Sequence, residues 1–254
     1  MKHRYLPITE QDQKEMLETI GISSMEEMFS DIPQQVRFQG DLQVGSALSE
    51  QGLLRYMRDL AGRNADFQRY ASFLGAGIYD HHLPVVINHV ISRSEFYTAY
   101  TPYQPEISQG ELQAIFEFQS YICELTGMAV ANASMYDGAT ALAEAGALAS
   151  GATKRSRLLV SRAVHPEARA VLRTSARGLN LDVVEIAVTP EGVTDLDDLA
   201  SKVASSDAAA VILQSPNFFG CLEDIAAVEP LAHGAGALLV VSANPLTLGL
   251  LDRQ

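Results

Sequence analysis

The chain has 254 residues, of which 47% are hydrophobic, so it can bury a substantial core as one large domain or two small ones. The net charge of −13 and the isoelectric point near 4.8 argue against nucleic acid or an anionic membrane surface as a partner. No signal peptide is read at the start, and no apolar run approaches the roughly 20 residues of a membrane-spanning helix. Cys123 and Cys221 follow no metal-binding spacing, which predicts reduced, buried thiols in a cytosolic protein.

The first 80 residues are predicted to form an N-terminal helical arm. Thr9, Ser24 and Ser49 each precede a helical pattern and can act as N-caps, and the first helix is expected to end at Gly21. Nothing in this arm indicates chemistry by itself.

Two adjacent histidines, His81 and His82, follow the arm. Side chains that are neighbours in sequence point apart, and no further ligand completes a metal-binding set. We therefore expect no metal site.

The stretch Glu95–Gln119 is the most distinctive part of the sequence. Tyr97, Tyr100 and Tyr103 recur every three residues among prolines and polar side chains, which predicts a polar loop because proline interrupts helices. Such loops often contain functional sites. The alternative interpretation is a surface loop whose tyrosines only pack against the next helix.

That next helix has its own start and stop signals. Ser108 and Glu111 have capping-box spacing, which predicts a helix starting after Ser108, and Gly127 is the expected stop. One face of this helix is apolar and is expected to pack in the core; it comprises Leu112, Ile115, Phe116, Ile122 and Cys123. A further helix is expected within residues 128–151, capped by Ser134 or Asp137.

From residue 157 onwards, apolar strands alternate with helices. The expected strands are Arg157–Val164, Leu181–Val188, Ala208–Ser215 and Ala237–Ala243. The expected helices between them are 166–178, 195–205 and 222–234. This alternation predicts an α/β fold with a mostly parallel sheet covered by helices on both faces. No G-x-G-x-x-G follows a strand, so NAD binding is not expected.

Polar residues follow three of these strands. In parallel sheets ligands bind beyond the carboxyl ends of the strands, where His165, Asn217 and Asn244 are expected to lie. The alternative for each of them is a polar turn residue at a strand end.

Three segments resemble a known family: LGAGIYDHHLP at 74–84, TAYTPYQPEISQG at 98–110 and NASMYDGATALAEA at 132–145. Over essentially its whole length the chain resembles the glycine cleavage system P-protein, the decarboxylating glycine dehydrogenase. It is most similar to the first subunit of the two-subunit bacterial form. That subunit continues beyond 254 residues in the family, so the chain is expected to be an N-terminal portion.

The resemblance implies a fold, an activity and partners. The fold would be a pyridoxal phosphate (PLP)-dependent transferase-like large domain of fold type I at residues 81–254, incomplete at its C-terminus, with residues 1–80 as an arm around the partner. The activity would be decarboxylation of glycine, with transfer of the aminomethyl group to the lipoyl arm of the H-protein. The assembly would be a cytoplasmic heterotetramer of two copies of each subunit.

The resemblance also identifies degenerate cofactor positions. Ser134 and Asp137 lie where such enzymes bind the cofactor phosphate at a helix N-terminus, but a carboxylate at Asp137 satisfies the helix dipole and repels a dianion. His165 matches the aromatic residue that stacks on the pyridine ring. Asn244 replaces the aspartate that pairs with the ring nitrogen, and a neutral amide cannot stabilise the pyridinium.

A PLP enzyme also needs a Schiff-base lysine. The chain contains Lys2, Lys14, Lys154 and Lys202, and none of them follows the last predicted strand. The resemblance implies that the second subunit holds PLP and its lysine, while this chain lines a shared cleft.

In that cleft the expected contributors are Tyr97, Tyr100, Tyr103 and Gln104, as neutral donors to the glycine carboxylate or the lipoyl arm. Two alternatives stay open. One is a non-catalytic structural or docking subunit. The other is an independent PLP-dependent lyase whose lysine lies beyond residue 254.

Overall fold

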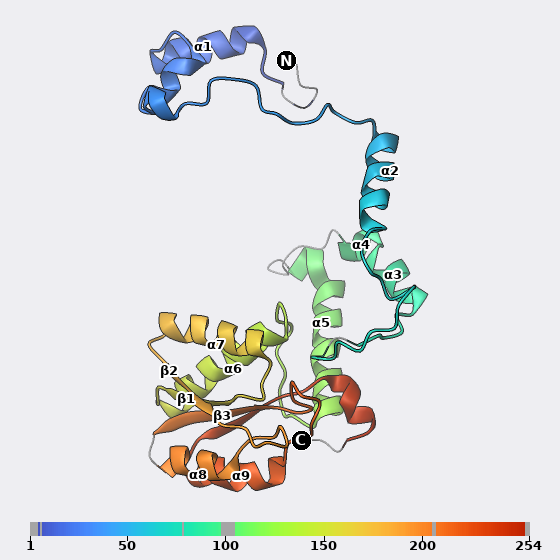
Figure 1. Ribbon diagram of the computed structural model, residues 1–254, viewed down its shortest axis with the longest axis vertical. Coiled ribbons are helices and arrows are strands. Elements are labelled where there is room, and N and C mark those ends of the chain that lie inside the picture. Colours follow the sequence, from blue (N-terminus) through green and yellow to red (C-terminus); the bar gives the residue numbers. More distant parts are fainter. Residues whose placement is uncertain (1–4, 6, 78, 98–104, 205–206, 252–254) are drawn as a thin grey trace. The chain divides into compact units, whose positions relative to one another are not determined.

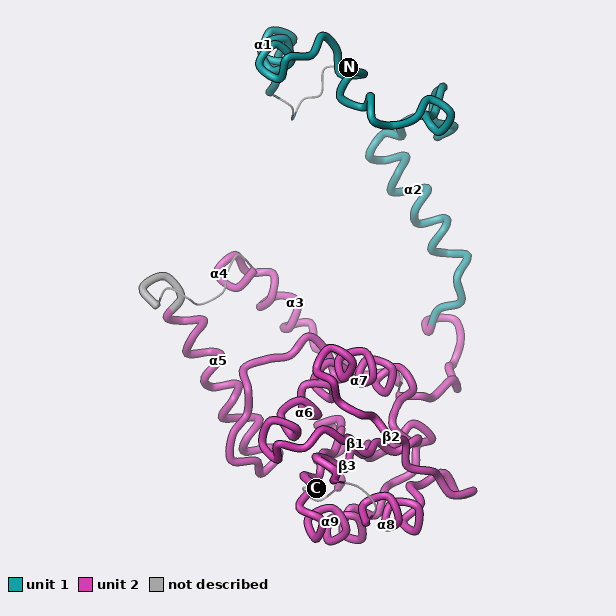
Figure 2. Tube along the Cα trace, turned by 90° about the vertical axis from the view of Figure 1, so that its left-hand side faces the viewer, with its two compact units in different colours: residues 1–66 teal, residues 67–254 magenta. Residues whose placement is uncertain are grey.

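The computed structural model describes residues 5, 7–77, 79–97, 105–204 and 207–251 (Figure 1). The chain divides into two compact units, Met1–Asp66 and Phe67–Gln254 (Figure 2). The expected division into an arm of residues 1–80 and a large domain of residues 81–254 stays a prediction.

The first unit consists of short helices, three of which begin at the predicted caps. Its elements are α1 (Glu10–Ile20), the 3-10 helices η1 (Met25–Phe29) and η2 (Gln34–Val36), and α2 (Glu50–Ala61). Thr9, Ser24 and Ser49 are the N-caps of α1, η1 and α2, and Gly21 ends α1 in the left-handed conformation at φ 86°. None of the described residues in this unit is fully buried.

The second unit begins with three helices: α3 (Val85–Ile91), α4 (Ser94–Tyr97) and α5 (Pro105–Thr126). The predicted start of α5 is wrong, because the helix begins at Pro105 and Ser108 lies inside its first turn. Proline suits the first helical position, where its missing amide hydrogen costs nothing. The predicted stop is confirmed: Gly127 has φ 75°, and its amide donates to the Cys123 carbonyl at 2.8 Å.

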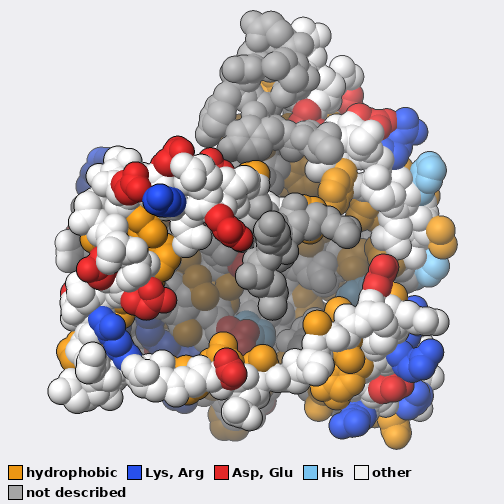
Figure 3. Space-filling view, turned by 90° about the horizontal axis from the view of Figure 1, so that it is seen from above, with side chains coloured by type: hydrophobic (Ala, Val, Ile, Leu, Met, Phe, Trp, Pro, Cys, Tyr) orange, Lys and Arg blue, Asp and Glu red, His pale blue; other side chains and the backbone are white. Residues whose placement is uncertain are grey.

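The apolar face of α5 is less buried than predicted. Leu112, Ile115, Ile122 and Cys123 are half-buried, whereas Phe116 is 70% exposed. In the view of Figure 3, apolar side chains lie at the surface between acidic and basic ones.

The rest of the second unit is the predicted α/β alternation. Its elements are α6 (Gly138–Thr153), β1 (Arg157–Ser161), α7 (Pro166–Gly178), β2 (Asp182–Ile186), α8 (Leu196–Ala204), β3 (Ala208–Gln214), α9 (Ile225–Gly234), β4 (Leu238–Ser242) and the 3-10 helix η3 (Pro245–Gly249). The strands are all parallel in the order β2-β1-β3-β4. Helices α6 and α7 cover one face and α8 and α9 the other (Figure 1). This confirms the predicted fold class.

The core lies on both faces of the central strands β1 and β3. Leu158 and Val160 of β1 face the α6 and α7 layer, whereas Leu159 faces α8 and α9, as strand alternation requires. Gly146 lets α6 approach closely, because a Cβ there would lie 3.0 Å from Leu158 Cδ1. In the part of the chain that the structure describes, no helix combines the length and apolar character needed to cross a bilayer.

The two outer strands are only partly buried, although their sequences suggested burial on both faces. Each pairs with a single neighbour in this sheet, which leaves one side of the strand open. β2 contains the charged residues Asp182 and Glu185, whereas β4 has none. Charges are a common protection of an edge strand, so β2 has the sequence of an edge and β4 does not.

Candidate functional site

His165 lies at the carboxyl edge of the sheet, between β1 and β3. It is the N-cap of α7, and its Nδ1 accepts the Glu167 amide at 3.2 Å. Its own amide donates to Gln214 Oε1 at 2.8 Å, which ties the loop after β1 to the end of β3. Since Nδ1 is an acceptor, the neutral ring has its proton on Nε2. The ring meets Phe218 edge to face, with 5.2 Å between the centroids.

Asn217 lies in the turn after β3 and is buried. Its Nδ2 donates to the Gly192 carbonyl and to Glu223 Oε1, both at 2.8 Å. Its Oδ1 accepts the amides of Phe219 at 3.0 Å and Cys221 at 3.1 Å. Both amide hydrogens and both oxygen lone pairs are therefore used within the loop. Asn217 is the polar turn residue of the alternative interpretation.

Sequence reasoning missed the acidic centre of this network, Glu223. This residue is 8% exposed, and its Oε2 accepts the Thr194 amide at 2.9 Å. The Thr194 hydroxyl in turn pairs at 2.8 Å with that of Ser161, the last residue of β1. No local sequence pattern distinguishes a buried glutamate from an exposed one. A serine at the end of an apolar strand could, however, have indicated a buried polar contact. The network joins the loops that follow β1, β2 and β3.

Asp137 is the N-cap of α6, as predicted. Its Oδ1 accepts the Thr140 amide at 2.8 Å and pairs with the Thr140 hydroxyl at 2.7 Å. Those hydrogen bonds, first that of the hydroxyl and then that of the amide, hold the pKa of Asp137 below its ordinary value. The carboxylate thus stays ionised and occupies a donor that a cofactor phosphate would use. Ser134, the other predicted cap, is exposed and does not cap the helix.

Asn244 follows β4 and is the N-cap of η3. Its Oδ1 accepts the Leu246 amide at 3.0 Å, and its carbonyl accepts the Thr247 hydroxyl at 2.7 Å. It is exposed and has a capping role of its own.

None of the described lysines follows β4. Lys14 pairs with Glu18 in the first unit at 3.8 Å. Lys154 ends α6, just before the amino end of β1. Lys202 Nζ donates to the Glu185 carbonyl at 2.7 Å and pairs with Asp198. Lys2 is outside the described residues. At the positions predicted for the phosphate and the ring nitrogen of PLP, this chain has a capping carboxylate, Asp137, and a capping amide, Asn244, and neither fits that role.

The tyrosine stretch is only partly described. Tyr97 is the last residue of α4 and is 80% exposed. Tyr100, Tyr103 and Gln104 lie outside the described residues. Their proposed place in a shared cleft stays a prediction.

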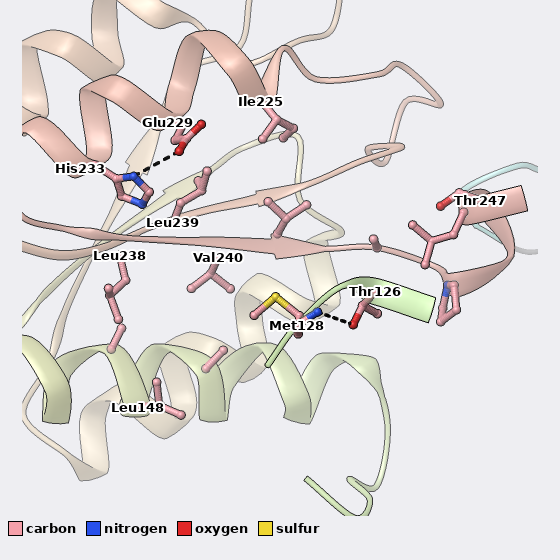
Figure 4. Close-up of a pocket in the computed structure, with 16 residues that line it drawn as sticks. Thr126, Met128, Leu148, Ile225, Glu229, His233, Leu238, Leu239, Val240 and Thr247 are labelled. Atoms are coloured by element: carbon pink, nitrogen blue, oxygen red, sulfur yellow. Dashed lines mark hydrogen bonds and ion pairs between the residues drawn. The ribbon is translucent and has the colours of Figure 1, made fainter. Parts of the chain in front are cut away.

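A cavity of about 720 Å³ runs along β4, and its lining includes Ala243 and Pro245, the two chain neighbours of Asn244. Figure 4 shows Leu238 and Val240 lining it on the side of Leu148, and Leu239 on the side of His233. His233 and Glu229, 3.5 Å apart, are its ionisable lining residues. The rest of its lining is mainly apolar, so the cavity offers hydrophobic contact and no set of catalytic groups.

Comparisons with known proteins agree over the whole chain. Residues 3–253 match the family described as glycine cleavage system P-protein. The chain is 62% identical over 251 residues to a probable glycine dehydrogenase (decarboxylating) subunit 1 of Bacillus cereus strain B4264, and 59% identical over 252 residues to one of Brevibacillus brevis. The alignments cover 99% of this chain and 56% of each relative. The chain thus spans about half the length of the curated relatives it matches.

Solved structures give the same result for the fold. The crystal structure of an inhibitor-bound glycine decarboxylase (P-protein) of the glycine cleavage system matches 98% of this chain and 55% of its own length, with a TM-score of 0.74 and 43% identity. Mouse CSAD matches with a TM-score of 0.58 at 16% identity, which shows the fold alone. The predicted PLP-dependent transferase-like fold is confirmed.

The buried network makes a testable prediction. Both oxygens of Glu223 accept hydrogen bonds from N–H groups. In Glu223→Gln one oxygen is replaced by an amide NH2 group, which then faces an N–H donor. The free energy of unfolding should therefore fall by about 1–3 kcal/mol. Urea unfolding followed by circular dichroism measures the change. The control Glu229→Gln, on the exposed face of α9, should stay within about 0.5 kcal/mol. Equal effects of the two substitutions would show that the buried carboxylate is not required.

Proposed function

The chain belongs to the glycine cleavage system P-protein family, and from that premise we propose that it is one subunit of a glycine decarboxylase. The complex would decarboxylate glycine and transfer the aminomethyl group to the lipoyl arm of the H-protein. This chain would line the reaction cleft, while a second subunit holds PLP on its lysine. The family match over residues 3–253 is the observation that carries this proposal.

The polar residues of this chain support the proposal that the second subunit, and not this chain, binds the cofactor. Asp137 caps α6 with an ionised carboxylate, where a phosphate would need free amides. Asn244 caps η3 with the side chain that would otherwise face a pyridine nitrogen. We propose that the cofactor is bound by the partner.

In the shared cleft, we propose Tyr97, Tyr100, Tyr103 and Gln104 as neutral donors to the glycine carboxylate or the lipoyl arm. A carboxylate that leaves as carbon dioxide loses its charge in the transition state. A tight cationic clamp would stabilise the ground state more than the transition state, so neutral donors suit this step better.

The relatives' designation as subunit 1 supports a second subunit. Exposed apolar side chains on α5, among them Phe116, Tyr121 and Leu125, provide surface for such a contact. We propose a cytoplasmic heterotetramer of two copies of each subunit, in which the N-terminal arm wraps around the partner.

A structural or docking subunit is the second candidate, and one observation favours it. His165, Asn217, Asp137 and Asn244 all use their side chains to cap helices or hold turns. In that case, substitutions in the tyrosine stretch would alter the stability of the complex while leaving the turnover per complex unchanged. An independent PLP-dependent lyase is less compatible with the carboxylate at Asp137.

Reconstitution tests the proposed function. The chain is co-purified with the lysine-bearing second subunit, and the exchange of bicarbonate carbon into glycine is measured in the presence of lipoylated H-protein. Exchange should require both chains, because each is expected to supply part of the cleft. Full exchange by the second subunit alone would contradict the proposal.

The tyrosines are tested one at a time in the same complex. Tyr100→Phe removes one hydrogen-bond donor and should lower kcat/KM for glycine or for the H-protein by about tenfold, the effect expected of one such bond. Tyr121→Phe on α5 is the control: it removes a hydroxyl about 24 Å along the helix from Pro105 but keeps the ring that packs at a subunit contact, so both values should stay unchanged. Identical kinetics of the two variants would remove Tyr100 from the cleft.

A further inference from the structure

Three arginines converge on one carboxylate at the outer edge of the sheet. Glu185 of β2 pairs through Oε1 with Arg169 and Arg173 of α7, and its Oε2 lies 3.9 Å from Arg162 Nε. We call these four residues the arginine cluster. Three guanidinium groups and one carboxylate leave two positive charges in excess.

This excess is unusual within the molecule. Five other ion pairs each join one cation to one carboxylate: Lys14–Glu18, Arg93–Glu95, Arg155–Asp207, Arg157–Asp182 and Lys202–Asp198. The chain has a net charge of −13 and therefore many acidic residues, yet among the described residues no ion pair adds a second carboxylate to the arginine cluster. The imbalance is therefore not explained by a shortage of counter-charges.

The three arginines have different local roles. Arg169 is the structural member: its side chain is 16% exposed, and its Nε donates to the Val164 carbonyl at 3.0 Å. Arg162 and Arg173 have side chains 60% and 43% exposed, and each guanidinium has five N–H donors. Glu185 has only two oxygens for three guanidinium groups, and these two side chains are exposed, so their N–H donors are accessible to an external anion.

The position of the cluster connects it to the candidate site. Arg162 directly follows the last residue of β1, and Arg169 lies one helical turn after His165, at the start of α7. The cluster thus borders the carboxyl edge of the sheet, where ligands of such folds bind. An anionic partner bound to the cluster would lie next to that edge.

We propose that the arginine cluster is a docking surface for the acidic surface of a protein. Resting on the proposed function, we assign it to the carrier protein that brings the lipoyl arm to the cleft. Arginine pairs with carboxylates in a planar, two-pronged geometry, and exposed charges at the rim of an interface accelerate and orient encounter. A patch of two exposed guanidinium groups suits several carboxylates of a protein surface.

The test uses the reconstituted two-subunit complex with lipoylated H-protein as the probe. The double variant Arg162→Gln/Arg173→Gln keeps Arg169 with Glu185 and removes the exposed charges. KM for the H-protein should rise about threefold to tenfold, while KM for glycine and kcat at saturation change less than twofold. The KM of the wild-type complex should rise with salt, and that dependence should be weaker in the variant because salt screens exposed charges.

Arg157→Gln is the matched control. Arg157 is 41% exposed, close to the value for Arg173, but it pairs with Asp182 alone at the amino end of β1. This variant should leave KM for the H-protein unchanged. An equal rise in both variants would mean a general charge effect and would overturn the assignment.

Other outcomes also overturn it. Weaker association of the two subunits in sedimentation, with unchanged kinetics per complex, would assign the cluster to the partner subunit instead. An unchanged KM for the H-protein in an active complex would leave the proposed function intact and remove the docking surface. No exchange activity in the wild-type complex would instead refute the proposed function itself.

Discussion

The arrangement of the candidate site depends on the parallel pairing of β1 with β3 at the centre of the sheet. Both strands are buried between two helical layers, so their carboxyl ends are held at one edge. The chain after each end is then fixed by hydrogen bonds to its neighbour: the His165 amide to Gln214, and the Ser215 amide to the Ser242 carbonyl at 3.0 Å. Glu223 completes the edge with two accepted hydrogen bonds.

At this edge the chain has the fold of a PLP enzyme, but its polar side chains cap helices and hold turns. An ionised cap at Asp137 fills the helix N-terminus that a phosphate would need, and Asn244 closes the chain after β4. If the partner subunit binds the cofactor, as we propose, this chain can use these positions for stability. The arginine cluster fits the same picture, because its excess charge is at the rim of the edge and not in the cofactor position.

Local signals predicted most of the fold, since caps and strand periodicity depend on neighbours in sequence. Thr9, Ser49 and Asp137 all cap helices where predicted. The capping box at Ser108 failed because Pro105 offered an earlier start. Glu223 and the arginine cluster could not be predicted, because their partners lie up to 29 residues away and only the folded chain brings them together. The tyrosine stretch was recognised by resemblance, and its role stays a proposal.

The most direct test of the account is to locate the Schiff base. The two-subunit complex, purified with PLP, is reduced with borohydride, and the pyridoxyl-lysine peptides of both chains are identified by mass spectrometry. The account predicts labelling of a lysine in the second subunit and none in this chain. A pyridoxyl-lysine in this chain at stoichiometric yield would contradict it.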